Sequence, residues 1–112
     1  MKDTPITYTV LLARDATDDL QAIYDYISVN DSPANAEYVV DQIEQTSRSL
    51  NTFPERGVYS PELLEMGNKK CREIFFKPYR IIYRIQDSTV YIMMIADGRR
   101  DLLAQLRRRL LK

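Results

Sequence analysis

The sequence predicts an α+β fold, an antiparallel sheet with a helical hairpin on one face and a short C-terminal helix, in the order β-α-α-β-β-β-α. Residues 71–97 are rich in Val, Ile, Tyr and Phe, and breakers at Lys77-Pro78 and Asp87-Ser88 divide them into an antiparallel meander. Two stretches with helical spacing of apolar residues precede the meander. A chain of 112 residues fits one domain, residues 1–112.

The first strand and the first helix lie near the start of the chain. Residues 6–13 (ITYTVLLA) form a β-rich run with no hairpin partner nearby, so we expect this strand to pair with the meander. Asp15 is the expected N-cap of the first helix, and Asp18 and Asp19 add negative charge to its first turn. The helix should end near Asn30.

The second helix and the last helix also carry start signals. Ser32 is the expected N-cap of the second helix, with Pro33 at the first helical position. Residues 51–69 contain breakers but enough apolar groups to form an ordered connection. Asp101 should cap a final helix. The leucines of that helix share one face: Leu102, Leu103, Leu106 and Leu110.

The Asp87-Ser88 turn sets the register of the last two strands, because side chains alternate strictly between the faces. A two-residue turn puts four pairs on one face: Gln86–Thr89, Arg84–Tyr91, Ile82–Met93 and Arg80–Ile95. It puts three apolar pairs against the helices: Ile85–Val90, Tyr83–Ile92 and Ile81–Met94. Arg80 and Arg84 then share an open or half-covered face. Arg72 faces Tyr83 on the helix side if the Lys77-Pro78 turn has two residues, and joins Arg80 if it has three.

Composition excludes several classes of chemistry. The chain has one cysteine, Cys71, and no histidine, so Ser-His-Asp and Cys-His catalysis and His- or Cys-rich metal sites are excluded. We expect no cofactor and no metal. No stretch is apolar enough to cross a membrane, and the first residues lack the pattern of a secretory signal. The expected location is the cytoplasm.

The net charge of zero hides two oppositely charged halves. Residues 1–66 carry 4 basic and 12 acidic side chains, 4 − 12 = −8, and residues 67–112 carry 12 basic and 4 acidic ones, 12 − 4 = +8. The split either provides a cationic surface for an anionic partner or lets the halves complement each other within the fold.

Short motifs in a fixed order resemble the RelE/ParE superfamily of type II toxins, in its ParE-like (plasmid stabilisation) branch. They span nearly the whole chain: Asp19-Leu20, Ile23, Tyr26-Ile27, Asp31-Ser32-Pro33, Ala36, Phe53-Pro54, Arg56-Gly57, Arg72-Glu73-Ile74, Tyr79-Arg80-Ile81-Ile82-Tyr83 and Gly98-Arg99-Arg100-Asp101. The resemblance implies a growth-inhibiting toxin that a cognate antitoxin neutralises in a hetero-oligomer.

The resemblance leaves two activities to choose between: ParE-like members inhibit DNA gyrase, and RelE-like members cut mRNA on the ribosome. Cleavage needs a group that exchanges a proton as well as cations at the scissile phosphate. Relatives commonly have histidine where this chain has Asp97, and nuclease members often carry a tyrosine after the position of Arg100. Glu73 and Lys77 carry no mark of a base. The sequence therefore favours gyrase inhibition by binding over endoribonuclease activity.

The candidate site residues for target or antitoxin binding are arginines: Arg72, Arg80, Arg84, Arg99, Arg100, Arg107 and Arg108. In a ribonuclease, Arg72, Arg80 and Arg99 would be the catalytic candidates. The alternative for Arg80 and Arg84 is that they pair with carboxylates of the acidic half. The alternative for Arg107 and Arg108 is that they form the solvated end of the last helix and bind no partner. A non-toxic member that only binds an antitoxin is a further alternative. The antitoxin segment that meets the arginines should be acidic and amphipathic.

Overall fold

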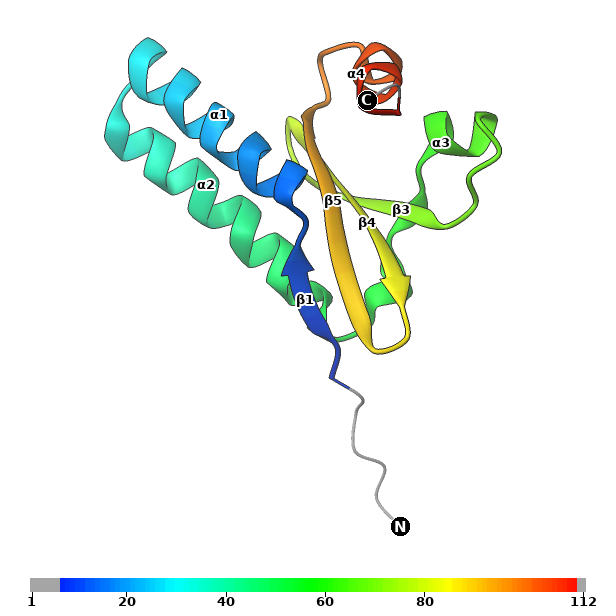
Figure 1. Cartoon of the computed structure of the whole chain (residues 1–112). Coiled ribbons are helices and arrows are strands. Elements are labelled where there is room, and N and C mark those ends of the chain that lie inside the picture. Colours follow the sequence, from blue (N-terminus) through cyan, green and yellow to red (C-terminus); the bar gives the residue numbers. More distant parts are fainter. Residues whose placement is uncertain (1–6, 111–112) are drawn as a thin grey trace.

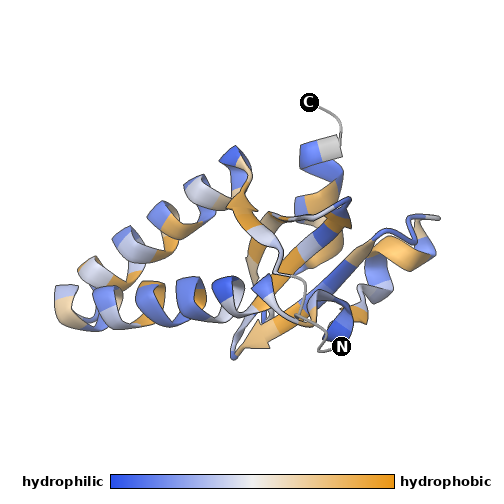
Figure 2. Cartoon of the chain, turned by 90° about the horizontal axis from the view of Figure 1, so that it is seen from below, coloured by the Kyte–Doolittle hydropathy of each residue, from blue (hydrophilic) through white to orange (hydrophobic). Residues whose placement is uncertain are grey.

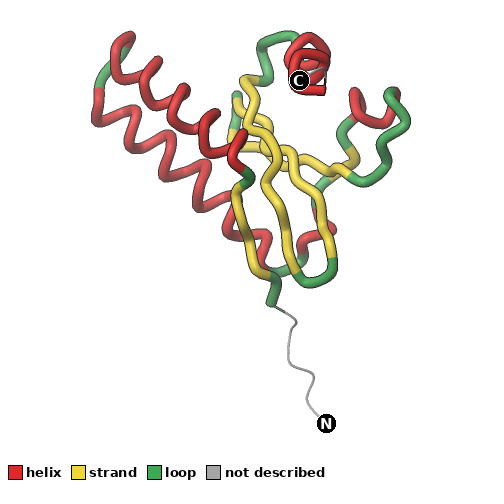
Figure 3. Tube along the Cα trace, in the orientation of Figure 1, coloured by secondary structure: helices red, strands yellow, loops and turns green. Residues whose placement is uncertain are grey.

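The computed structural model describes residues 7–110 (Figures 1 and 3). The strands are β1 (Thr9–Leu12), β2 (Val58–Tyr59), β3 (Cys71–Phe76), β4 (Tyr79–Gln86) and β5 (Thr89–Asp97). The helices are α1 (Arg14–Asn30), α2 (Pro33–Arg48), α3 (Pro61–Glu65) and α4 (Leu102–Leu110), with two 3-10 turns, Ser49–Asn51 and Pro54–Arg56. The predicted α+β class and element order are confirmed, and the connection before β3 is ordered, with β2 and α3 as additions.

The strands form one sheet in the order β1-β5-β4-β3-β2. β3, β4 and β5 are the predicted antiparallel meander. β2 pairs with β3 and is also antiparallel to it. β1 pairs with the meander as expected, but it runs parallel to β5. The parallel pairing is possible because β1 and β5 are separated in the chain by α1, α2, β2, α3, β3 and β4, so no tight hairpin turn forces them to be antiparallel.

α1 and α2 form the predicted antiparallel hairpin and cover one face of the sheet (Figure 1). The Ser32 hydroxyl accepts a hydrogen bond from the Asn35 N–H at 3.1 Å, and Pro33 is the first residue of α2, so the predicted start of this helix is confirmed. Figure 2 shows apolar residues concentrated on the strands and on the inner sides of the helices.

The predicted N-cap of α1 is wrong. The helix begins at Arg14, and Ala13, which has no capping side chain, occupies the cap position in place of Asp15. The Ala13 N–H donates to the Ile92 carbonyl at 2.8 Å. The last hydrogen bond between β1 and β5 therefore fixes where the helix starts, and no side-chain cap is needed.

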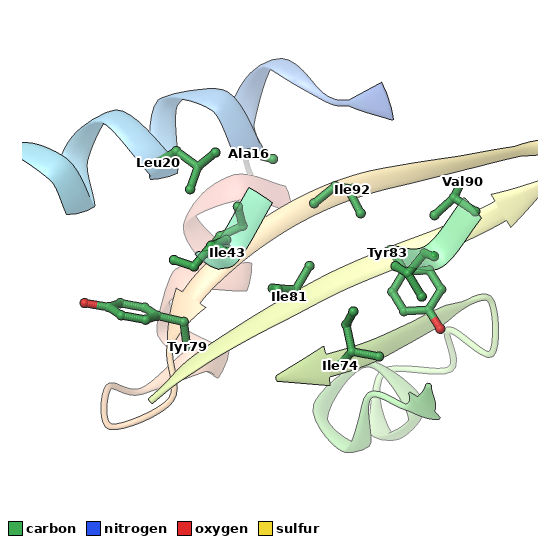
Figure 4. Packing of buried hydrophobic residues seen from close by; sticks show 11 residues of the cluster. Ala16, Leu20, Ile43, Ile74, Tyr79, Ile81, Tyr83, Val90 and Ile92 are labelled. Carbon is green, nitrogen blue, oxygen red and sulfur yellow. The ribbon is translucent and has the colours of Figure 1, made fainter. Parts of the chain in front are cut away.

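The main core lies between the hairpin and the sheet (Figure 4). Ala16 and Leu20 from α1 and Ile43 from α2 pack on it from the helix side. The strands contribute apolar side chains that alternate toward the helices: Ile74, Tyr79, Ile81, Tyr83, Val90, Ile92 and Ile95. The alternation predicted for β4 is therefore confirmed.

A second, smaller core lies on the opposite face, which carries Arg80 and Arg84. Its members come from the strands and from the helices α3 and α4: Leu63, Cys71, Ile82, Met94, Ala96, Leu102 and Leu106. α3 and α4 lie over one end of this face (Figure 1). The face is thus half-covered, and Cys71 is buried in the part that the helices cover.

The predicted register of β4 and β5 holds only near their turn. Gln86–Thr89, Ile85–Val90, Arg84–Tyr91 and Tyr83–Ile92 pair as expected. The register then shifts between Ile82 and Tyr83, so the predicted Ile82–Met93, Ile81–Met94 and Arg80–Ile95 pairs are wrong. The observed pairs beyond the shift are Ile82–Met94, Ile81–Ile95 and Arg80–Ala96. One extra residue in β5, a β-bulge, moves Ile95 to the helix side.

The Lys77-Pro78 turn has two residues, and Arg72 therefore pairs with Tyr83 on the helix side of the sheet. The buried Tyr83 hydroxyl donates to the Pro54 carbonyl at 2.5 Å and accepts from the Gly57 N–H at 3.0 Å. A side chain on Gly57 would place its Cβ 2.8 Å from the Glu73 carbonyl oxygen. Tyr83 and Gly57 thus fix the connection against the sheet.

Candidate functional site

A groove of about 560 Å³ lies between α1, the end of β5 beside the start of β4, and α4. We call it the arginine groove. Its lining combines charged, aromatic and apolar side chains: Asp19, Ala22, Ile23, Tyr26, Tyr79, Ile95, Asp97, Arg99, Arg100, Gln105, Arg108 and Arg109. Arginines and tyrosines in one recess suit a protein segment that carries carboxylates beside apolar side chains.

Asp19 joins the walls of the groove. One carboxylate oxygen accepts from the Arg109 guanidinium on α4, and the other accepts from the Ile95 N–H on β5 at 2.9 Å. The side chain is only 14% exposed. Burial raises the pKa of Asp19, and the Arg109 and Ile95 hydrogen bonds oppose that rise. The sequence indicated only a charge near the helix start, because nothing in it connects Asp19 with Arg109.

Asp97 and Arg99 form an exposed pair at the mouth of the groove. Asp97 accepts from the Arg99 backbone N–H and Nε, both at 2.9 Å, and from Nη2 at 2.8 Å. The Arg99 side chain is 69% exposed. The Arg99 hydrogen bonds lower the pKa of Asp97, so this carboxylate stays ionised. Asp97 therefore orients the guanidinium toward solvent.

Two tyrosines and two further arginines complete the groove. Tyr79 is buried, and burial raises the pKa of its hydroxyl, whereas Tyr26 is exposed. Arg100 and Arg108 are exposed. Among the residues that the structure describes, neither forms an ion pair. Their guanidinium groups are available to a partner.

Arg80 lies outside the groove, on the face that carries the second core. Its guanidinium contacts Glu62 on α3 at 2.6 Å and Glu73 on β3 at 2.7 Å. Arg80 is 13% exposed and Glu73 4%. The two carboxylates raise the pKa of Arg80, and Arg80 lowers the pKa of Glu62. Glu62 lies in the acidic half, so this geometry matches the alternative in which that half pairs with Arg80, and Glu73 of the basic half adds a second carboxylate.

Arg72 is held on the other side of the sheet. Its Nη1 donates to the carbonyls of Glu55 and Gly57, both at 2.9 Å, and its Nη2 donates to the Tyr59 hydroxyl at 3.1 Å. The guanidinium also lies 4.3 Å from the centre of the Tyr59 ring. These contacts attach β2 and the preceding turn to β3, which is a structural role.

The structure thus brings together only Arg99, Arg100 and Arg108 of the seven candidate arginines. Arg84 lies on the half-covered sheet face beside Tyr91, and Arg107 is exposed on α4. Sequence analysis missed Asp19, Tyr26 and Arg109 as groove residues. Residues 7–110 contain no group of three or more Cys, Asp or Glu side chains placed to hold a metal ion. No helix within them is long and apolar enough to span a membrane.

Solved structures with the same fold come from two toxin–antitoxin systems. One chain of the chromosomal ParDE system of P. aeruginosa aligns with a TM-score of 0.69, at 22% identity, over 81% of this chain and 96% of that one. One chain of the RelBE2 toxin–antitoxin complex of Mycobacterium tuberculosis aligns with a TM-score of 0.57, at 24% identity, over 86% and 97%. The fold is that of the RelE/ParE superfamily.

The family model of the ParE toxin of the type II toxin–antitoxin system parDE matches residues 10–102. Toxin ParE3 of Caulobacter vibrioides is 29% identical over 97 residues, which cover 87% of this chain and 93% of that toxin. The chain belongs to the ParE toxin family. The matched region ends at the first residue of α4, so Arg108 and Arg109 lie beyond it.

Proposed function

We propose that this toxin inhibits DNA gyrase by binding it through the arginine groove and that a cognate antitoxin neutralises it. In this proposal Arg99, Arg100 and Arg108 contact gyrase, and the exposed Tyr26 provides aromatic surface in the same groove. Arginine guanidinium groups form bidentate hydrogen bonds with carboxylates, so an acidic surface of gyrase is the expected target.

The observation that carries this proposal is the separation of Arg72, Arg80 and Arg99. A ribonuclease would need them to converge on one phosphate. Arg72 lies on the helix side of the sheet, bound to backbone carbonyls, and Arg80 lies on the other side between two carboxylates. Arg99 lies beyond the end of β5. Their placement supports binding over RNA cleavage.

The titratable groups of the groove support the same choice. A general acid or base works best with a pKa near neutral pH. The pKa of Asp97 is lowered by Arg99, and that of Tyr79 is raised by burial, so both are moved away from neutrality. The pKa of Asp19 is raised, but both of its oxygens already accept hydrogen bonds within the fold.

A cognate antitoxin is the second partner in the proposal. The solved structures with this fold include a toxin–antitoxin complex and a ParDE system. The exposed arginines favour an antitoxin segment that is acidic and amphipathic and that becomes ordered on binding. Such a complex is a hetero-oligomer of toxin and antitoxin.

Expression of the free chain tests the proposal. We expect growth arrest with gyrase-dependent DNA breaks and an unchanged pattern of mRNA ends. Ribosome-dependent mRNA cuts with intact DNA would contradict gyrase inhibition and establish the RelE-like activity. Unimpaired growth, together with a tight complex with the product of the adjacent reading frame, would establish a non-toxic binding member.

A further inference from the structure

Four side chains lie in a row across the sheet, on the face away from the hairpin. Leu11 on β1 pairs with Tyr91 on β5, Tyr91 pairs with Arg84 on β4, and Arg84 pairs with Cys71 on β3. Cys71 is covered by the second core, which includes Leu63 of α3. Leu11 is 48% exposed, and Tyr91 and Arg84 are partly exposed. The row is therefore open along Leu11, Tyr91 and Arg84.

In this row the Arg84 guanidinium has a hydrogen-bond donor without an acceptor. Its guanidinium carbon lies 5.7 Å from the centre of the Tyr91 ring, and its Nε is buried without a hydrogen-bond partner among the described residues. Arg80, on the same strand and face, has two carboxylate partners. A buried donor without an acceptor is costly, and a carboxylate matches a guanidinium in geometry and charge. Among the described residues no carboxylate pairs with Arg84, so its guanidinium can bind one from a partner.

The surroundings of Arg84 suit a peptide and not a nucleic acid. Nucleic-acid binding relies on several cations that contact successive phosphates. The next row toward the β4–β5 turn consists of Thr9, Thr89 and Gln86, which carry no charge. In the other direction the next side chain on this face is the buried Ile82, and Arg80 beyond it is neutralised by Glu62 and Glu73. One unpaired cation beside an exposed leucine and a tyrosine fits one acidic residue flanked by apolar side chains.

We propose that the Leu11–Tyr91–Arg84 row is a docking site for such a segment of the antitoxin, separate from the arginine groove. This inference rests on the proposed function, because it takes the antitoxin as the partner. The row faces away from the hairpin, whereas Tyr79 and Ile95 of the groove face it, so the row and the groove are separate surfaces on opposite faces of the sheet.

Binding measurements with matched variants test the docking site. The probe is the protein encoded by the adjacent reading frame, purified and titrated into the toxin. We expect Arg84→Gln and Leu11→Asn to weaken binding, by roughly tenfold or more for Arg84→Gln, because the partner carboxylate loses its cation. Arg48→Gln removes one exposed positive charge from α2 and serves as the control, with affinity expected within about twofold. Arg84→Gln should keep its effect on gyrase.

Hydroxyl-radical footprinting of the wild-type complex gives a result that does not depend on variant folding. Oxidation of Tyr91 should fall on binding, whereas oxidation of Tyr38, which is exposed on α2, should not.

Unchanged affinity of both variants, or unchanged Tyr91 oxidation in a complex that forms, would refute the docking site and leave the proposed function standing. Loss of gyrase inhibition by a folded Arg84→Gln would also refute it, because the row would then belong to the target site. A wild-type chain without toxicity or partner would refute the proposed function itself.

Discussion

Arg109 on the last helix donates a hydrogen bond to Asp19 on the first helix, across 90 residues of sequence. The same carboxylate accepts the Ile95 N–H of β5. A single side chain therefore connects α1, β5 and α4 around the arginine groove. The position of Arg108, the neighbour of Arg109, depends on this connection.

We expect Arg109→Gln to loosen α4, because Asp19 would remain buried without its counter-charge. Hydrogen exchange of the amides of α4 should become about tenfold faster, while exchange in the sheet stays unchanged. Arg107→Gln, an exposed change on the same helix, is the control. Equal exchange rates in the two variants would mean that Leu102 and Leu106 alone hold the helix.

Removal of Arg80 should be strongly destabilising, because it leaves Glu73 buried without a cation. We expect Arg80→Ala to lower the free energy of unfolding by about 3–5 kcal/mol in urea denaturation. Arg48→Ala, at an exposed position of α2, should change it by less than about 0.5 kcal/mol. A loss for Arg80→Ala as small as that control would contradict the role given to the buried pair.

Stability should fall with acid in part through Glu62. Its pKa in the folded protein lies below its ordinary value of 4.5 because of Arg80, so its stabilising contribution is present above that value and is lost as pH falls through the folded pKa. Asp19 acts in the opposite sense, because its pKa is raised. We expect Glu62→Gln to be less stable than wild type at about pH 7, and the difference should disappear once the pH has fallen below the lowered pKa of Glu62. A stability difference that does not vary with pH would be inconsistent with this assignment.

Tyr83→Phe tests how the connection before β3 is fixed. The substitution leaves the Gly57 N–H and the Pro54 carbonyl without their partner, and we expect a loss of about 1–3 kcal/mol in the free energy of unfolding. Tyr38→Phe removes an exposed hydroxyl and keeps the ring that packs edge-on against Phe76, so its loss should be near zero. Equal values for the two variants would show that the hydroxyl of Tyr83 contributes nothing.

Local patterns predicted much of this fold. α2 begins at Pro33 with Ser32 as its N-cap, as predicted. Side-chain alternation correctly predicted that Ile81 and Tyr83 face the helices. The β-bulge was not predictable, because Ile92, Met93, Met94, Ile95 and Ala96 are all apolar and fit either face. The parallel direction of β1 was missed because a lone strand carries no sign of its partner's direction.

The candidate site was predicted less well than the fold. Arg99, Arg100 and Arg108 do lie in one groove. Arg80 instead forms an ion pair with Glu62, and Arg72 donates a hydrogen bond to the Glu55 carbonyl, both of them partners outside the strand that carries the arginine. The interaction of Arg80 with Glu62 depends on how α3 folds over the sheet, and that of Arg109 with Asp19 depends on how α4 returns to α1. Tertiary packing determines these pairs, and composition and periodicity do not reveal it.

The most direct test of the central claim is a DNA cleavage assay with purified gyrase, supercoiled plasmid and the free toxin. Wild-type toxin should trap cleavage complexes, and Arg100→Gln combined with Arg108→Gln should reduce them roughly tenfold or more while thermal unfolding stays unchanged. Arg48→Gln should behave as wild type. Absence of cleavage complexes with wild type, or full activity of the folded double variant, would contradict gyrase inhibition through the arginine groove.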